Sequence, residues 1–213
     1  MSHVAHHFDD AQQQLDAATI GMWLFLATEV LFFGGMFLAY TVYRTQYPAA
    51  FEEGSAHLSV PIGTTNTAIL LTSSLSMALA IHAARRNRRW LSVALLGATM
   101  LLGAAFLGVK AFEYADKFEH HLVPGRHFAL EHPHNPDVSP GHVELFYGLY
   151  FAMTGMHALH MVIGLGVLAV LAVMTGRGAF SAEYHTPLEM TGLYWHFVDM
   201  VWVFLFPLLY LIG

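Results

Sequence analysis

LEMTGLYWHFVDMVWVFLFPLLYLIG, residues 188–213, is the stretch that decides the fold. It is apolar and long enough to cross a bilayer as a helix, which takes roughly 20 residues. Its centre nevertheless holds His196 and Asp199, within YWHFVDMVW at 194–202. Their i, i+3 spacing puts both side chains on one face of a helix. Ionisable groups at membrane depth are costly and normally face a protein interior or a wet cavity, so the stretch predicts a membrane helix with a polar inner face.

The composition indicates that the chain is a membrane protein. Its 213 residues are 56% hydrophobic and only 11% charged, whereas soluble domains carry about 25% charged residues. A net charge of -6 offers no basic surface for nucleic acid. Because cysteine is absent, disulfides, iron–sulfur clusters and thiolate metal sites are excluded.

Five segments are apolar and long enough to span the membrane, so the predicted fold is all-α, an integral membrane bundle of five transmembrane helices. The expected spans are residues 20–43, 62–84, 90–114, 145–174 and 188–212. Residues 1–19 form a polar N-terminal tail, and residues 20–213 form the transmembrane domain. The tail has neither a basic region nor a small-residue cleavage site, so we expect no cleaved signal peptide.

The arginines predict the orientation. Residues 85–89 read RRNRR, and the positive-inside rule places this turn in the cytoplasm. The N-terminal tail is then cytoplasmic, and the C-terminus and the connection at about 115–144 are outside. Histidines crowd both the connection and the tail, and such crowding can bind metal. Proline interrupts helical ligand spacing in the connection, which favours a solvated loop. The histidines are His120, His121, His127, His132, His134 and His142 in the loop and His3, His6 and His7 in the tail.

Further ionisable residues lie inside the other spans. Glu29 is in the first span, and His157 and His160 are one helical turn apart in the fourth. Together with His196 and Asp199 they could meet inside one bundle. Three interpretations are open: a polar network that fixes helix register, a metal site, or a path for protons or ions. The spans lack the Glu-x-x-His pairs of a di-iron bundle, which weighs against metal.

Two groups of residues lie near span ends. Lys110 and Glu113 are spaced i, i+3 near the outer end of the third span, which predicts a local ion pair with a lysine able to reach the interface. His82, Arg85 and Arg86 lie at the inner end of the second span and could contact anionic lipid head groups. Ordinary topological positive charge explains these arginines equally well.

Five runs of sequence, taken together, resemble subunit III of the haem-copper respiratory oxidases, with the order and spacing of that family from about residue 20 to 213. The resemblance is closest to the cytochrome c oxidase branch, in its short five-helix form without the two first spans of longer relatives. Glu29 favours that branch. The runs are ATEVLFF at 27–33, TNTAILL at 65–71, AFEY at 111–114, TGMHALH at 154–160 and WHFVD at 195–199.

The resemblance implies an accessory subunit with no catalytic centre and no metal of its own, because the haems and copper of the family belong to partner subunits. It implies packing on the catalytic subunit I beside other oxidase subunits, with a respiratory supercomplex as a further expectation. It also implies bound phospholipid, and support of proton uptake and of durability during aerobic electron transport. The expected location is the bacterial plasma membrane.

The resemblance also implies roles for residues. Glu29 matches a glutamate that the family holds as a buried carboxyl in a lipid-lined cleft, and a structural role is implied for His157, His160 and His196. The alternative functions are subunit III of a ubiquinol oxidase, a relative associated with nitric oxide reductase, or, outside the family, a membrane metalloenzyme or a proton transporter.

Overall fold

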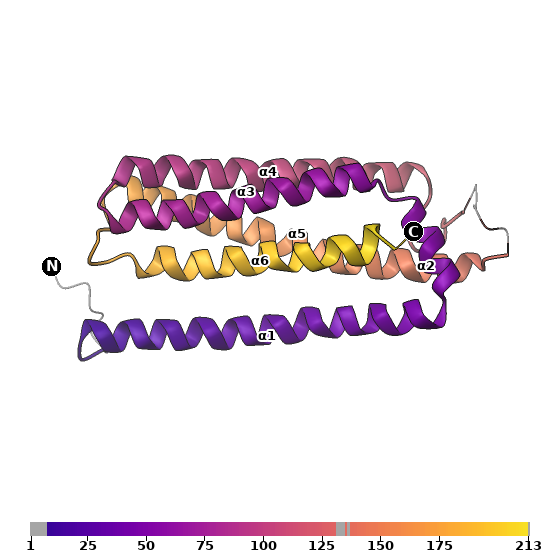
Figure 1. Ribbon diagram of the computed structural model, residues 1–213, viewed down its shortest axis with the longest axis horizontal. Coiled ribbons are helices and arrows are strands. Elements are labelled where there is room, and N and C mark those ends of the chain that lie inside the picture. Colours follow the sequence, from indigo (N-terminus) through magenta and orange to yellow (C-terminus); the bar gives the residue numbers. More distant parts are fainter. Residues whose placement is uncertain (1–7, 131–134, 136, 213) are drawn as a thin grey trace.

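The structure is a computed structural model that describes residues 8–130, 135 and 137–212, and in them it contains helices and no strands (Figure 1). Five helices are apolar and long enough to cross a membrane, which confirms the predicted all-α fold with five spans. A sixth helix, α2, is too short to be a span. The helices are α1 (Ala11–Gln46), α2 (Pro48–Ala56), α3 (Val60–Arg85), α4 (Arg89–Glu119), α5 (Pro140–Gly176) and α6 (Thr186–Tyr210).

Helix α2 is the element that the sequence analysis did not predict. Pro48 occupies its first turn, where a missing backbone N–H costs nothing. Phe51 is fully buried and packs edge-on against Tyr40 and Phe146, with ring centroids 5.2 and 5.5 Å apart. Helix α2 therefore fastens the end of α1 to α5. The long helices also run past the predicted span limits, since α1 begins at Ala11 and α5 begins at Pro140.

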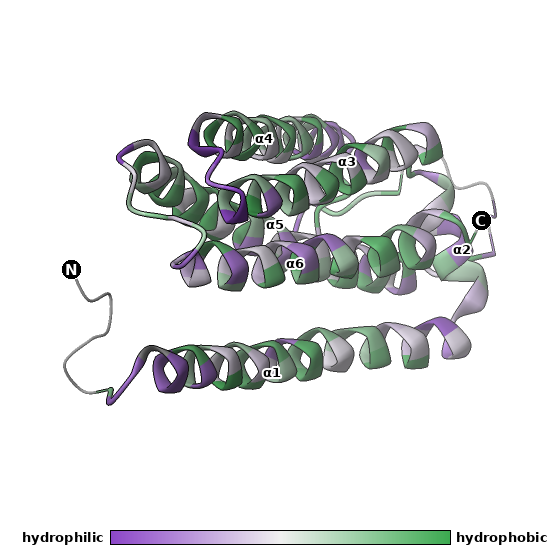
Figure 2. Cartoon of the chain, turned by 60° about the vertical axis from the view of Figure 1, so that its left-hand side comes forward, coloured by the Kyte–Doolittle hydropathy of each residue, from purple (hydrophilic) through white to green (hydrophobic). Residues whose placement is uncertain are grey.

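Helices α3 and α5 end in tight turns at the Arg85 end of the bundle. Asn87 has a positive φ of 56°. The N–H groups of Arg88 and Asn87 donate to the carbonyls of Ala83 and Ala84, both at 2.9 Å, which is the Schellman arrangement at a helix end. Gly178 closes α5 in the same way with a φ of 80°. Hydrophilic residues gather at the α3–α4 turn, while apolar residues dominate the spans (Figure 2).

Helices α3, α4, α5 and α6 form a tightly packed group, and α1 lies along its edge against α5 and α6 (Figure 1). Trp195 of α6 is fully buried at the centre of this group, and its Nε1 donates to Ser73 Oγ at 2.9 Å. Its ring passes between Gly103 of α4 and Gly164 of α5, where a Cβ on either glycine would lie 2.9 Å from the ring. The bare backbone at both glycines lets α6 approach its neighbours closely.

Candidate functional site

Glu29 of α1 meets His160 of α5 across the helix interface, with Oε2 and Nε2 3.1 Å apart. Both side chains are largely enclosed, at 18% and 12% exposure. His160 Nδ1 also lies 2.8 Å from the carbonyl oxygen of Met156. Since a carbonyl only accepts, Nδ1 carries a proton in this hydrogen bond. The contact between Glu29 and His160 is therefore a hydrogen bond or an ion pair that joins α1 to α5.

Aromatic rings surround the Glu29–His160 pair. The ring of Phe33 lies edge-on to His160, with centroids 5.3 Å apart, and also contacts Phe197 at 6.1 Å. Tyr194 donates its hydroxyl to the carbonyl of His160 at 2.9 Å. The polar contacts between α1 and the other spans in the described residues are this pair and the bond from the Tyr40 hydroxyl to the Leu208 carbonyl. The pair thus also anchors α1.

The other intramembrane polar residues have different surroundings, so Glu29, His157, His160, His196 and Asp199 do not form one hydrogen-bonded network. His196 Nδ1 lies 2.7 Å from Ser74 Oγ of α3. His157 is buried between Phe106 and Trp202, at 5.4 Å from each ring. Neither ring nitrogen of His157 and neither carboxyl oxygen of Asp199 has a hydrogen-bond partner among the residues described.

Lys110 and Glu113 form an ion pair with Nζ and Oε2 3.3 Å apart, and both are buried inside the bundle. Lys110 Nζ donates to the hydroxyls of Tyr150 and Tyr210 at 2.9 and 3.0 Å, and those hydroxyls donate in turn to Glu113 Oε1. The lysine therefore points into a cage of aromatic residues instead of toward the interface. The sequence analysis missed both tyrosines, because they lie on α5 and α6, far from Lys110 in the chain.

The predicted lipid-contacting residues lie at the Arg85 end of the bundle. A groove of about 500 Å³ lies there between α1, α3 and α6, and its lining residues include His82, Arg85 and His196. Arg85 also bonds to Glu189, with its Nε 2.9 Å from Glu189 Oε1. His185 Nε2 lies 3.0 Å from the same carboxyl oxygen. Arg86 is exposed and does not line the groove.

No group of three or more histidine, aspartate or glutamate side chains is placed to hold a metal ion within the described parts of the chain. His157 and His160, which share an i, i+3 spacing, have different surroundings. Among the histidines of the tail and the loop, His3, His6, His7, His132 and His134 lie outside the described residues.

A family model described as cytochrome c oxidase subunit III matches residues 3–120 and 142–213. The chain is 32% identical to cytochrome bo(3) ubiquinol oxidase subunit 3 of Pseudomonas aeruginosa, over 99% of this chain and 92% of the relative. It is 34% identical to cytochrome c oxidase subunit 3 of Thermostichus vulcanus, over 96% and 92%. It is 32% identical to cytochrome c oxidase subunit 3 of Cyprinus carpio, over 96% and 72%. The chain belongs to the subunit III family of the haem-copper oxidases.

Proposed function

We propose that this chain is a non-catalytic accessory subunit of a haem-copper terminal oxidase, in which it packs on the catalytic subunit, binds phospholipid and supports proton uptake and durability. The family match over almost the whole chain is the observation that carries this proposal. The haems and copper would be held by partner subunits. The membrane would be a bacterial plasma membrane, with the Arg85 end of the bundle toward the cytoplasm, as the arginine run supports.

The groove at the Arg85 end supports the proposed lipid binding. Its walls include Ala78, Ile81 and Leu193, which suit acyl chains, and its cationic group is the guanidinium of Arg85, with the imidazole of His82 beside it. The guanidinium of Arg85 has five N–H donors. Its contact with Glu189 uses the N–H of Nε and one N–H of a terminal nitrogen. The remaining donors and the neighbouring histidine suit the phosphate of an anionic phospholipid.

Association with the catalytic subunits is tested by purification through an affinity tag on this chain from its native membrane. We expect haem-containing oxidase subunits to co-purify in a fixed ratio with the tagged chain, and the preparation to reduce oxygen. Recovery of the chain alone under mild detergent, with the haem left in the unbound fraction, would contradict the proposal.

The electron donor is part of the same test. We propose cytochrome c as the donor, since Glu29 favours that branch. The ubiquinol oxidase relative, at 32% identity over 99% of the chain, supports quinol as the second candidate. Oxygen consumption by the co-purified complex with reduced cytochrome c, and little with ubiquinol, is the expected result. The reverse preference would assign the chain to the quinol branch.

Glu29 is expected to react with an apolar carbodiimide that enters from the membrane. Addition of a carboxyl to a carbodiimide consumes a proton, and the imidazole of His160, 3.1 Å from the Glu29 carboxyl, is placed to relay it. We predict one label per chain at Glu29 by peptide mass spectrometry, its loss in Glu29→Gln, and weaker labelling in His160→Phe. Asp16→Asn, which alters an exposed carboxyl near the start of α1, is the matched control. Unchanged labelling in Glu29→Gln would refute the assignment.

A further inference from the structure

Four exposed arginines at the Arg85 end of the bundle form a positively charged surface that the proposed function does not use. They lie at the two connections of that end, between α3 and α4 and between α5 and α6. The chain as a whole has a net charge of -6, so this end differs in charge from the rest. The four residues, which we call the arginine surface, are Arg86, Arg88, Arg89 and Arg177.

The two connections are joined to each other, which brings arginines from distant parts of the chain to one place. Asn87 Oδ1 accepts a hydrogen bond from the backbone N–H of Ala182 at 2.8 Å, although the two residues are 95 positions apart in the chain. A terminal nitrogen of Arg89 lies against Gly178, where a Cβ would be 3.2 Å from it. The guanidinium of Arg89 is therefore placed against the turn that carries Arg177.

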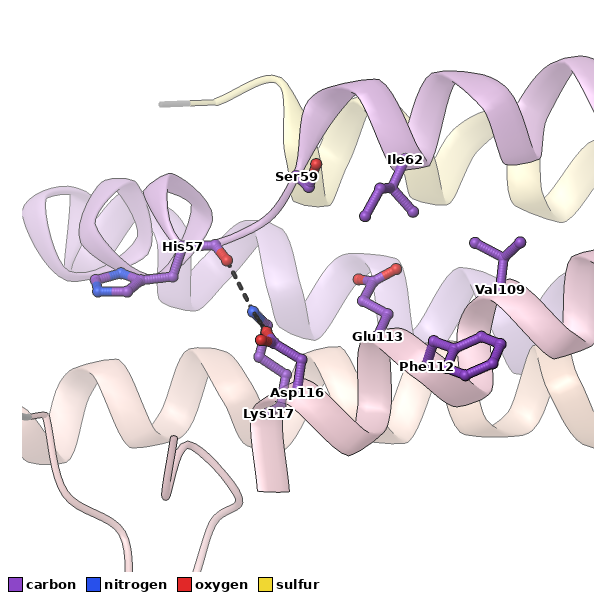
Figure 3. A pocket seen from close by; sticks show the side chains of 8 residues that line it. All are labelled: His57, Ser59, Ile62, Val109, Phe112, Glu113, Asp116 and Lys117. Carbon is purple, nitrogen blue, oxygen red and sulfur yellow. Dashed lines mark hydrogen bonds and ion pairs between the residues drawn. The ribbon is translucent and has the colours of Figure 1, made fainter. Parts of the chain in front are cut away.

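The arginine surface has no counter-charge within the described part of the chain. Arg85, on the same connection, is bonded to Glu189. At the opposite end of the bundle, Lys117 Nζ donates to Asp116 Oδ2 at 2.8 Å and to the carbonyl of His57 at 2.9 Å (Figure 3). None of the four side chains of the arginine surface makes such a hydrogen bond or ion pair with the described residues. Like charges gathered in one place repel, so anionic groups from outside the chain would stabilise this arrangement.

The position of these arginines favours a protein partner over lipid head groups. The connections close the ends of the helices, so the arginine surface faces out of the end of the bundle (Figure 1), whereas lipids lie beside the helices. The side of α4 that lipids would cover carries the exposed apolar residues Trp90 and Leu91. The positive-inside rule requires cationic residues in cytoplasmic connections, but it does not require two connections to be bonded into one surface.

We propose that the arginine surface binds an acidic segment of a partner subunit, in which several aspartates or glutamates lie close together. Guanidinium groups bind carboxylates through two parallel N–H···O bonds, so four of them suit a segment with several carboxylates. The contact rests on the proposed function, since the segment would belong to another subunit of the oxidase. It adds a polar contact at the end of the bundle to the proposed packing of the spans, and it would favour correct orientation of the partner.

The test uses the intact oxidase complex, purified through a tag on this chain, with a photoactivated benzoylphenylalanine in place of Ala182. This position is exposed, and its backbone is bonded to Asn87, so the probe lies within the arginine surface and all four arginines are kept. Cross-linked peptides are identified by mass spectrometry after irradiation. We expect the main cross-link to join residue 182 to a segment of another oxidase subunit that is rich in aspartate and glutamate.

Charge variants of the same probe-carrying chain test the recognition. Arg88→Glu/Arg177→Glu should lower the yield of this cross-link about tenfold, since the loss of one exposed ion pair alone changes affinity by up to about fivefold. Arg88→Lys/Arg177→Lys, which keeps both charges, should retain most of the yield. Arg126→Glu alters an exposed arginine at the opposite end of the bundle and is the matched control, with no expected change. Co-purified haem shows that each variant has folded and assembled.

Four outcomes would overturn the acidic partner. They are the absence of any cross-link, cross-links to phospholipid alone, a main cross-link to a segment without acidic residues, and an unchanged yield in Arg88→Glu/Arg177→Glu. Cross-links to phospholipid alone would make the arginine surface a membrane contact. In all four cases the proposed function stands as long as haem-containing subunits co-purify with the unaltered chain. Their absence from that preparation would refute the proposed function itself.

Discussion

Replacing Glu113 by alanine is expected to lower the free energy of unfolding by about 3–5 kcal/mol, the usual cost of breaking a buried ion pair. Lys110 would be left inside the bundle without its carboxylate partner, with only tyrosine hydroxyls as polar neighbours. The measurement is unfolding of the purified chain in mixed detergent micelles, followed by circular dichroism as the denaturing detergent increases. Glu119→Ala, at the exposed end of the same helix, is the matched control and should change stability by less than about 0.5 kcal/mol.

The double variant Lys110→Met/Glu113→Leu identifies the cause. Removing both charges leaves no unpaired ion, and replacement of a buried pair by apolar residues is often neutral or stabilising. We therefore expect the double variant to be more stable than Glu113→Ala alone, which is a non-additive effect of neighbouring residues. Equal stability of Glu113→Ala and Glu119→Ala would contradict the buried pair as a source of stability.

Replacing Trp195 by alanine is expected to cost about 3–5 kcal/mol, as large-to-small changes of buried aromatic residues do. The ring is fully buried and fills the space between Gly103 and Gly164, and its loss also leaves Ser73 Oγ without its indole donor. The same micelle unfolding experiment measures the effect. Trp23→Ala, at a position of α1 that is 59% exposed, should have little effect, so similar losses in the two variants would contradict the packing account.

The sequence was sufficient to predict the five spans, because the length and hydropathy of each span are local properties. It also identified Lys110 and Glu113, whose contact lies within one helix. Helix α2 was missed because nine residues give little periodicity, and its stability comes from Phe51 packing on α1 and α5. Contacts between helices depend on how each helix is rotated, which the sequence does not specify.

The histidines of α5 show how helix rotation matters. Residues three apart on a helix differ by about 60° around its axis, so His157 and His160 share a face without sharing an environment. His157 packs among Phe106 and Trp202 in the core, while His160 faces α1 and meets Glu29. A single shared network was therefore a reasonable expectation from spacing alone, but the rotation of α5 divides it.

The role of the subunit in turnover can be measured as the rate and the persistence of oxygen consumption. The central claim is that this chain supports the oxidase without supplying its chemistry. The Glu29–His160 pair, the proposed lipid and the proposed packing surface would act on how protons reach the partner and on how long activity lasts. Both quantities can be read from one assay if haem content is held equal between samples, since the catalytic centres are then matched.

The most direct measurement is a time course of oxygen consumption by the purified complex, with and without this chain, at equal haem content and at several pH values. The account predicts that the depleted complex still reduces oxygen, that its rate falls more steeply than that of the intact complex as the pH rises, and that its activity declines over many turnovers. Complete loss of oxygen reduction from an intact, haem-loaded remainder would contradict the account, because the chain would then supply a catalytic group. Identical time courses at every pH would also contradict it, by leaving the chain no supporting role in turnover.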